Sequence, residues 1–429
     1  MRTILVAGVL VSVGIAAGYI GVLLYAPKEV ASAVEAAKAA GYPVTVEELD
    51  AWYQLSADRI NASDLYMKAF ELDAKSGSAL SEKSLPFVGE GALPDFSVPL
   101  PEAQRTSATN YLASKAEVLK ALHEASATSA CRYDFRIGEA GPDDLPHLNG
   151  LRHAVQLLAL ESCVAAEDKQ GNAAVGALMA GYAAASSLRD EPMLASQLAR
   201  VASVSAMTEA LERVLNHAEL DNMQLSQVLS SVSFSEAPHA FERAFAGERC
   251  FGLAAFPDEP AGVTEDGDTT IMGQCYALMG VRRLDTWAFA VFMEELIAAS
   301  EEPLHQRRTA YKEWSTRVDK LPAIFVITKH KLDELEKATT ADLKGSALLR
   351  VATAAIAVEQ YQNDAGRLPE SLDALVPRYL EVVPGDPFAP APIRYESSGI
   401  RSEVSSVGLD SAPDSGLTTD DDIIVTVVH

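Results

Sequence analysis

The hydrophobic pattern divides the chain into an apolar start, a long helical middle and a short β-type end. Over residues 104–235, and again over 282–318, apolar residues recur at steps of three and four, which is the period of one helix face. Beyond about residue 341, one helix is followed by proline-punctuated segments in which apolar and polar positions alternate, as in short strands. The pattern predicts a mainly α protein of stacked helix hairpins with a small C-terminal α+β domain.

Local signals set the limits of these regions. Thr45 is followed three residues later by Glu48, ahead of an apolar run, and this is the signature of a capping box at a helix start. Residues 76–103 are rich in serine, proline and glycine, so we expect a loop or linker there. The predicted domains are a transmembrane anchor over 1–28, an extracytoplasmic helical domain over 29–340 and the α+β domain over 341–429.

One segment of the helical domain predicts a pair of packed helices. An apolar-periodic run that starts near residue 147 is followed by a turn signal at Gly171 and Asn172 and by a second, Ala- and Gly-rich run that ends before Pro192. This arrangement is similar to a degenerate tetratricopeptide-type hairpin. The resemblance favours the stacking of helix pairs.

The apolar start is long enough to cross a membrane. Residues 3–25 carry no charge and lie between Arg2 and Lys28, and about 20 apolar residues suffice for a spanning helix. A cleaved signal peptide is the alternative, with small residues at 16–18, but the apolar run continues to Tyr25 beyond them. Either reading exports the rest of the chain. We expect a single-pass protein of the inner membrane with its bulk outside the cytoplasm.

Composition and charge restrict the kinds of molecule that this protein can bind. Hydrophobic residues make up 48% of the chain and charged residues 22%, as in globular proteins. The formal net charge of −25 is spread along the chain and would repel a phosphate backbone. We therefore expect no nucleic acid as a partner, and instead the membrane and other proteins of the cell envelope.

Four cysteines leave the question of disulfides open. None of them forms a Cys-x-x-Cys pair, so a structural metal site has little support. Because export permits disulfides, Cys250 and Cys275 could bridge the ends of the acidic loop between them, and a bridge between Cys131 and Cys163 is a second hypothesis. The alternative is that all four are small buried hydrophobic side chains.

The last domain carries the most specific pattern. Its features in chain order are Glu359-x-Tyr361, Asn363-Asp364-x-Gly366-x-x-Pro369, Leu372 and Leu375, Pro384-x-Asp386-Pro387-Phe388, Arg394-Tyr395, Ser406-Val407-Gly408-Leu409-Asp410 and Asp422-Ile423. This succession resembles the globular domain of the major pseudopilin of bacterial type II secretion systems. The whole chain resembles uncharacterised exported proteins of planctomycete-type bacteria. About 300 residues separate the anchor from this domain, so the resemblance implies a stand-alone domain rather than a subunit of the usual pseudopilus core.

Local chemistry agrees with an α+β fold for this domain. Gly366 suits a left-handed helix cap, and Asp386-Pro387 suits a rigid turn. The segments APIRYES, SEVSSVG and DIIVTVV are short and alternating, and they predict a three-stranded antiparallel sheet packed on the helix.

The pseudopilin resemblance also implies a metal site. In that family the loop that matches residues 405–423 binds calcium through carboxylate and backbone oxygens, and calcium takes six to eight oxygen ligands. The implied carboxylate ligands here are Asp410, Asp414, Asp420 and Asp422. The spacing after Asp410 differs from the family, and the loop is not an EF-hand. Calcium is therefore a candidate cofactor, with a solvated acidic turn as the alternative.

Catalytic motifs are sparse. His147 and His153 lie near Asp143 and Asp144, as an exported hydrolase could require, but no nucleophile elbow and no His-Glu-x-x-His motif accompanies them. Ordinary polar positions at a helix start are the favoured explanation of the two histidines. We expect a non-enzymatic, membrane-anchored extracytoplasmic scaffold or interaction protein, associated with a secretion or pilus-like assembly. An exported hydrolase with its site in the helical domain is the alternative.

Overall fold

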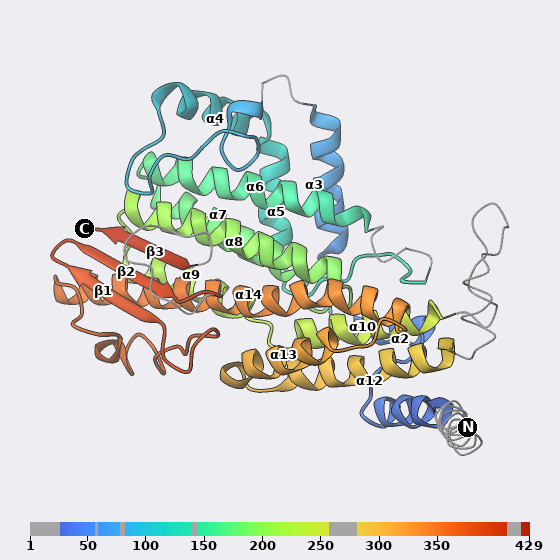
Figure 1. The fold of residues 1–429 in the computed structure, drawn as a ribbon. Coiled ribbons are helices and arrows are strands. Elements are labelled where there is room, and N and C mark those ends of the chain that lie inside the picture. The colour runs from blue at the N-terminus through green and yellow to red at the C-terminus, as the bar shows by residue number, and fades with distance from the viewer. Residues whose placement is uncertain (1–25, 56–58, 78–81, 139–144, 257–280, 410–421) are drawn as a thin grey trace, which may run out of the picture.

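Helices dominate the fold, and three strands close the chain (Figure 1). The computed structural model describes residues 26–55, 59–77, 82–138, 145–256, 281–409 and 422–429. The α-helices are α2 (Val46–Trp52), α3 (Ser63–Ser76), α4 (Glu102–Ser114), α5 (Ala116–Ser126), α6 (Pro146–Glu167), α7 (Gly171–Ser186), α8 (Leu194–His217), α9 (Asn222–Ser235), α10 (Ala240–Ala254), α12 (Val281–Glu301), α13 (Leu304–Asp319) and α14 (Val326–Ala365). Short 3-10 turns are η1 (Glu82–Ser84) and η2 (Leu372–Leu375), and the strands are β1 (Arg394–Ser398), β2 (Arg401–Ser406) and β3 (Ile423–Val428). The mainly helical fold with a small antiparallel sheet is as the sequence predicts.

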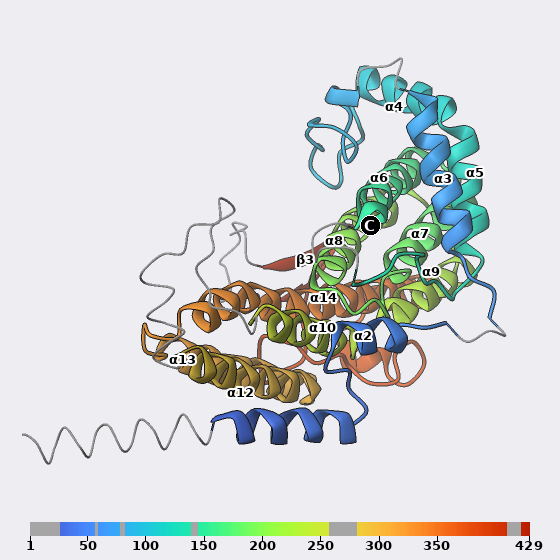
Figure 2. The ribbon, with the colours of Figure 1, turned by 90° about the vertical axis from the view of Figure 1, so that its right-hand side faces the viewer.

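The predicted transmembrane segment, residues 3–25, lies outside the described residues. Among the helices that the structure describes, none is both long and apolar enough to cross a bilayer. Residues 26–39 are helical, and Figure 2 shows this helix beside α12. Shortly after it, the Tyr42 hydroxyl lies between Glu242 of α10 and Glu301 of α12, at 2.5 and 2.6 Å, and donates its single proton to one or the other. These contacts join the start of the described chain to the helical stack.

The central helices stack in two layers. One layer holds α5, α7 and α9 side by side, and the other holds α4, α6 and α8 (Figure 2). Small residues bring the layers close together. A Cβ atom on Gly181 of α7 would lie only 2.3 Å from the sulfur of Met207 on α8, so a larger residue there would force the Met207 side chain to move. The predicted stacking of helix pairs follows from such Ala- and Gly-rich faces.

The turn between α6 and α7 lies earlier than the sequence suggests. Gly171 and Asn172, the predicted turn, are the first residues of α7. The chain reverses just before them, where Lys169 takes a left-handed conformation with φ of 58°. The Lys169 ammonium donates to the carbonyl of His217 at the end of α8, at 2.6 Å. The sequence predicts a turn that uses the conformational freedom of Gly171. In the structure, the turn is formed at Lys169 and is accompanied by the contact of Lys169 with α8.

The loop expected over residues 76–103 is fastened to the helical stack. The buried Arg213 side chain of α8 donates to the carbonyls of Pro94 and Val98, at 3.1 and 3.0 Å, and pairs with Glu167 of α6 at 3.3 Å. These bonds hold the loop against the stack as part of the fold. Except for the end of α3, η1 and the start of α4, its described residues are not helical.

The long helix α14 serves both the helical stack and the sheet. It runs for 40 residues and ends, as predicted, at Gly366, whose φ of 67° is left-handed. Its neighbours include α8 and α9 of the stack and β2 and β3 of the sheet, all within one hydrophobic core. The domain boundary expected between residues 340 and 341 therefore falls inside a continuous helix.

The three strands follow one another in an antiparallel sheet of order β1-β2-β3. Val404 of β2 lies opposite Tyr395 of β1 and Val425 of β3. Both valines are buried because the alternation along the strands turns one face toward α14. The sheet that the sequence predicts from its three alternating segments is confirmed.

Asp386 fixes the turn that leads into the sheet. Its buried carboxylate accepts hydrogen bonds from the Phe388 amide and the Ser406 hydroxyl, both at 2.8 Å, and from the Val407 amide at 2.9 Å. The rigid turn expected at Asp386-Pro387 is thus also the anchor for the end of β2, which the sequence pattern did not indicate.

Candidate functional site

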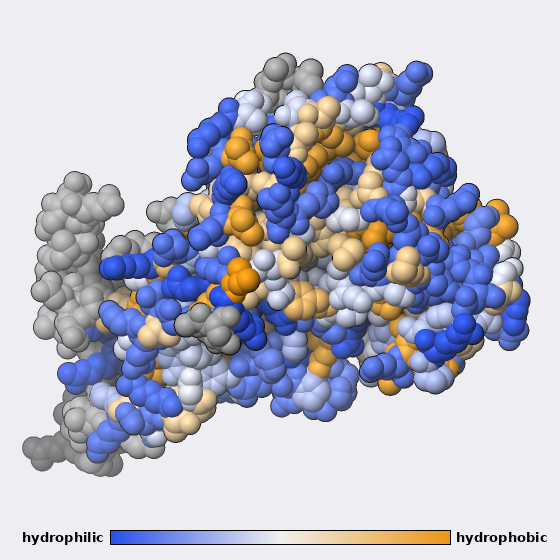
Figure 3. Space-filling model, turned by 180° about the vertical axis from the view of Figure 1, so that it is seen from behind, coloured by the Kyte–Doolittle hydropathy of each residue, from blue (hydrophilic) through white to orange (hydrophobic). Residues whose placement is uncertain are grey.

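A groove of about 570 Å³ runs over the layer formed by α5, α7 and α9. This layer lies on the face opposite to that of Figure 1, where apolar and weakly polar residues gather among hydrophilic ones (Figure 3). The groove lining comprises His123, Ser126, Ala127, Thr128, Ser129, Cys131, Gly176, Met179, Ala183, Ser187, Gln227, Ser230, Ser231 and Phe234.

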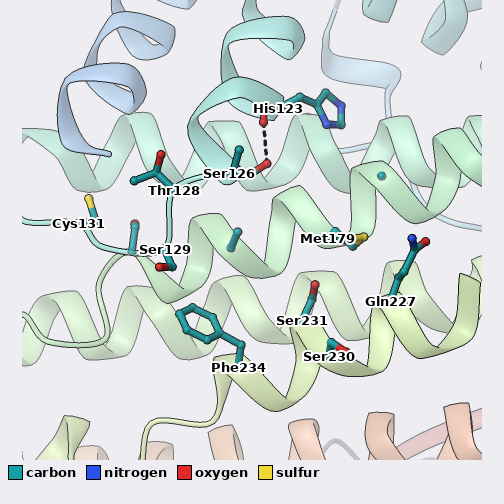
Figure 4. A pocket seen from close by; sticks show the side chains of 14 residues that line it. His123, Ser126, Thr128, Ser129, Cys131, Met179, Gln227, Ser230, Ser231 and Phe234 are labelled. Carbon is teal, nitrogen blue, oxygen red and sulfur yellow. Dashed lines mark hydrogen bonds between the residues drawn. The ribbon is translucent and has the colours of Figure 1, made fainter. Parts of the chain in front are cut away.

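Helical spacing brings the lining together. Gly176, Met179 and Ala183 lie three and four residues apart on α7 and form the floor. On α9, Gln227, Ser230, Ser231 and Phe234 share one face by the same spacing, while Ser126 ends α5 on the other side (Figure 4). The small floor residues keep the groove open between larger neighbours. A Cβ on Gly176 would already lie 4.0 Å from the His123 ring.

Apart from His123, the described residues that line the groove carry no charge, in an otherwise acidic protein. Its lining includes no aspartate, glutamate, lysine or arginine, whereas such residues make up 22% of the chain. Several hydroxyl protons are already used within the helices. Ser126 donates to the His123 carbonyl at 2.8 Å, and Ser230 donates to the Ser226 carbonyl at 2.9 Å (Figure 4). The lone pairs of these hydroxyl oxygens remain as acceptors for N–H donors of a ligand.

Two titratable side chains border the groove. A hydrogen bond of 2.9 Å joins His123 Nε2 to Glu161, and this bond raises the pKa of His123 against the opposing effect of burial. Burial raises the pKa of the Cys131 thiol to about 12. Cys131 is therefore protonated at neutral pH and lacks the thiolate that a nucleophile needs. The groove therefore presents hydrogen-bonding groups and apolar surface, without a nucleophilic thiol.

The two histidines expected in a hydrolase site belong to separate networks. His147 is buried, stacks on Tyr133 with ring centroids 4.1 Å apart, and lies 3.1 Å from Glu191. Glu191 also accepts a hydrogen bond from Tyr53 of the α2 segment at 3.2 Å. This network ties α2 and α6 to the chain before α8.

His153 belongs to a second network that joins α3, α4 and α6. Its Nδ1 lies 2.5 Å from Asp73 and its Nε2 lies 3.3 Å from the Tyr111 hydroxyl. Asp73 also pairs with the buried Lys115 at 2.8 Å, and together these contacts lower the pKa of Asp73 although burial opposes them. Asp143 and Asp144 lie outside the described residues. His147 and His153 thus do not converge on a common site.

Most of the predicted calcium ligands cannot be placed. Asp410, Asp414 and Asp420 lie outside the described residues, and Asp422 is the residue before β3. In the part of the chain that the structure describes, no three His, Cys, Asp or Glu side chains gather as a metal site would require. Ser406, which precedes the loop, donates its hydroxyl to Asp386. The calcium site remains a prediction.

Cysteine pairing differs from one of the two hypotheses. Cys131 and Cys163 are free thiols, so the bridge between them that the sequence suggested is wrong. Cys163 is buried among the apolar residues of the α6 face, as a small hydrophobic side chain. Cys250 is also a free thiol, and it donates to the Pro43 carbonyl at 3.3 Å. Its proposed partner, Cys275, lies outside the described residues.

The groove residues carry no motif by which sequence reasoning could have found them. Serine, alanine and glycine at helical spacing are ordinary surface residues until neighbouring helices are placed beside them. The one available signal is the run Gln227–Phe234 in α9, where the outward positions are uncharged although the chain is acidic. Comparison of the chain with family models, curated proteins and solved structures finds no match.

Proposed function

We propose that this protein is a membrane-anchored, extracytoplasmic scaffold that binds an extended polypeptide segment in the groove over α5, α7 and α9. The observation that carries the proposal is a groove across three successive helices of the stack; its described lining is rich in hydroxyls and carries no charge apart from His123.

The size of the groove suits a short extended segment. Its lining on α9 runs from Gln227 to Phe234, eight residues or seven helical steps, which corresponds to about 10 Å at a helical rise of ~1.5 Å per residue. An extended chain advances roughly 3.3 Å per residue, so about three residues fit. The hydroxyl oxygens offer acceptors for backbone N–H groups, and Met179 and Phe234 offer apolar contact for side chains.

The location and the secretion link are part of the same proposal. The uncharged residues 3–25 support a single span of the inner membrane, with the groove outside the cytoplasm. The pseudopilin-like succession over 359–423 supports an association with a secretion or pilus-like assembly, and the acidic loop after Ser406 supports calcium as a ligand.

Site-directed photo-crosslinking in intact envelopes tests the binding groove. A photoreactive residue replaces Met179 on the groove floor, and a matched control replaces Ala173, which is exposed on the same helix outside the groove. We expect a reproducible adduct from position 179 that is absent from position 173.

Two further variants connect that adduct to the groove. Ala183→Trp fills the floor, and Gln227→Ala removes an amide from the wall without adding bulk. We expect the first to abolish the adduct and the second to reduce it, with helicity by circular dichroism unchanged. An equal yield of the same adduct from positions 173 and 179, or an adduct insensitive to Ala183→Trp, would refute the groove as the binding site.

A further inference from the structure

The C-terminal sheet meets the helical stack through an unusual edge. Strand β3 is the last in the sheet, and its outer side would ordinarily present unpaired backbone groups. Side chains of α8 take the place of a fourth strand there. Glu212 accepts from the Thr426 amide at 2.7 Å, while Asn216 donates to the Thr426 carbonyl at 2.7 Å and accepts from the Val428 amide at 3.0 Å.

Glu212 holds this position among charges of mixed sign. On α8 itself, Glu209 and Arg213 lie near it, and Asp95 faces it from the loop before α4. Burial raises the pKa of Glu212 to about 7; Glu209 and Asp95 add to this effect, and the bond from Thr426 and the charge of Arg213 oppose it. The carboxyl thus exchanges its proton near neutrality.

A second buried carboxyl lies under the same sheet. Glu359 of α14 lies 3.5 Å from the ring of His429, the residue after β3, and that ring lies 3.2 Å from the Ser402 hydroxyl of β2. Tyr361 and Tyr395 are further titratable groups near Glu359. Glu359 Oε1 is buried and accepts no hydrogen bond.

Burial shifts both members of the Glu359 and His429 pair toward their neutral forms. It raises the pKa of Glu359 to about 8 and lowers the pKa of His429. No hydrogen bond links the two, and burial opposes charge on each of them.

We propose that the joint between the C-terminal sheet and helices α8 and α14 is a pH-sensitive latch, closed while Glu212 and Glu359 carry their protons and loosened when both ionise. The two carboxyls lie on two different helices; Glu212 contacts β3 and Glu359 contacts His429, the residue that follows it, so both ionisations act on the end of the sheet. The latch is independent of the groove over α5, α7 and α9.

The sign of the effect follows from linkage. Each carboxyl has an ordinary value of 4.5 and a raised pKa in the closed joint, so the closed joint binds more protons and opens as pH rises through about 7 to 8. The pKa of His429 is lowered in the closed joint, so protonation of His429 favours opening as the pH falls below its ordinary value of 6.5. Between pH 6.5 and 8.5 the carboxyl effect dominates, because His429 opposes it by at most a factor of about two. If the open joint restores ordinary values, its opening constant rises on the order of 100-fold over this range.

Hydrogen exchange of the full chain in detergent measures the opening directly. The protection factors of the β3 amides, corrected for the intrinsic pH dependence of exchange, are compared between pH 6.5 and 8.5. We expect protection of residues 423–428 to fall by tens-fold to 100-fold, while protection of α6 and α7 changes little. Unchanged protection of β3 across this range overturns the latch.

Three variants assign the effect to the two carboxyls. Glu212→Gln and Glu359→Gln mimic the protonated forms, and each is expected to reduce the pH dependence, with the double variant nearly independent of pH. Glu403→Gln, on β2 and paired with Arg401 at 2.8 Å, removes a charge from the same sheet and should leave the wild-type dependence intact. A double variant that keeps the full dependence, or a control that loses it, assigns the pH response elsewhere. Near-ultraviolet circular dichroism at pH 6.5 confirms that each variant folds.

Discussion

Replacing Asp386 with asparagine tests how the C-terminal fold is held. The buried carboxylate accepts three hydrogen bonds, two at Oδ1 from Phe388 and Ser406 and one at Oδ2 from Val407. In Asp386→Asn, one oxygen becomes an amide NH2. If the remaining oxygen keeps the bonds from Phe388 and Ser406, the new NH2 group faces the Val407 N–H. One hydrogen bond is then lost, and two donors point at each other.

The magnitude follows from the bond that is lost. A hydrogen bond to a charged acceptor contributes about 1.5–3 kcal/mol, and a buried donor left without a partner costs a similar amount. We expect the free energy of opening of this region to fall by about 3 kcal/mol. Because ~1.4 kcal/mol corresponds to a factor of ten, hydrogen-exchange protection of residues 401–407 should fall by roughly 100-fold.

A matched control separates the buried carboxylate from charge removal in general. Asp373→Asn makes the same change on the exposed side of η2, and an exposed substitution of this kind is usually within about 0.5 kcal/mol of neutral. Protection should therefore stay within a few-fold of the wild type. If Asp386→Asn lowers protection no more than Asp373→Asn does, the carboxylate does not anchor the end of β2.

Three further predictions address other parts of the chain. Arg213→Met removes the donors that hold the carbonyls of Pro94 and Val98, and it leaves Glu167 with only the Leu100 amide and Arg105 as partners. We expect a loss of about 3 kcal/mol and faster proteolysis within residues 85–101, and unchanged cleavage kinetics would contradict this role. Calcium should raise the melting temperature of the full chain, and a chelator should reverse the increase. The double variant Asp410→Asn, Asp414→Asn should show no increase. A melting temperature that does not respond to chelator would show that the calcium site does not exist. Burial raises the pKa values of Cys131 and Cys163 to about 12, so both thiols should resist alkylation in the native protein. After unfolding without reductant, both should react fully, as measured by mass spectrometry. A thiol that stays blocked after unfolding would indicate a disulfide.

The groove and the pH-sensitive joint lie on different sides of the helical stack. The groove is formed by α5, α7 and α9, whereas the joint uses α8 and α14. The closest link between them is packing, since α7 contacts both α8 and α9 and α14 contacts the same two helices. Variants that change the latch should therefore leave the crosslinking at Met179 measurable on its own.

Hydrophobic spacing along the chain was sufficient for the helical character, the three strands and several local features. Thr45 caps α2 by accepting from the Glu48 amide, and Gly366 ends α14 in the left-handed conformation, both as expected. These features depend on residues close together in the chain, whose backbone preferences are readable locally.

Tertiary packing decided the rest. The Lys169 turn, the fastening of a loop by Arg213 and the hydrogen-bonding of Asp386 each join segments that are far apart in sequence. The groove arises only when helices α5, α7 and α9 lie side by side, and the raised pKa values of Glu212 and Glu359 arise only when a sheet covers them. Apolar periodicity reports which face of a helix is buried, but neighbours, burial and charge at a site are set by long-range contacts that no local pattern encodes.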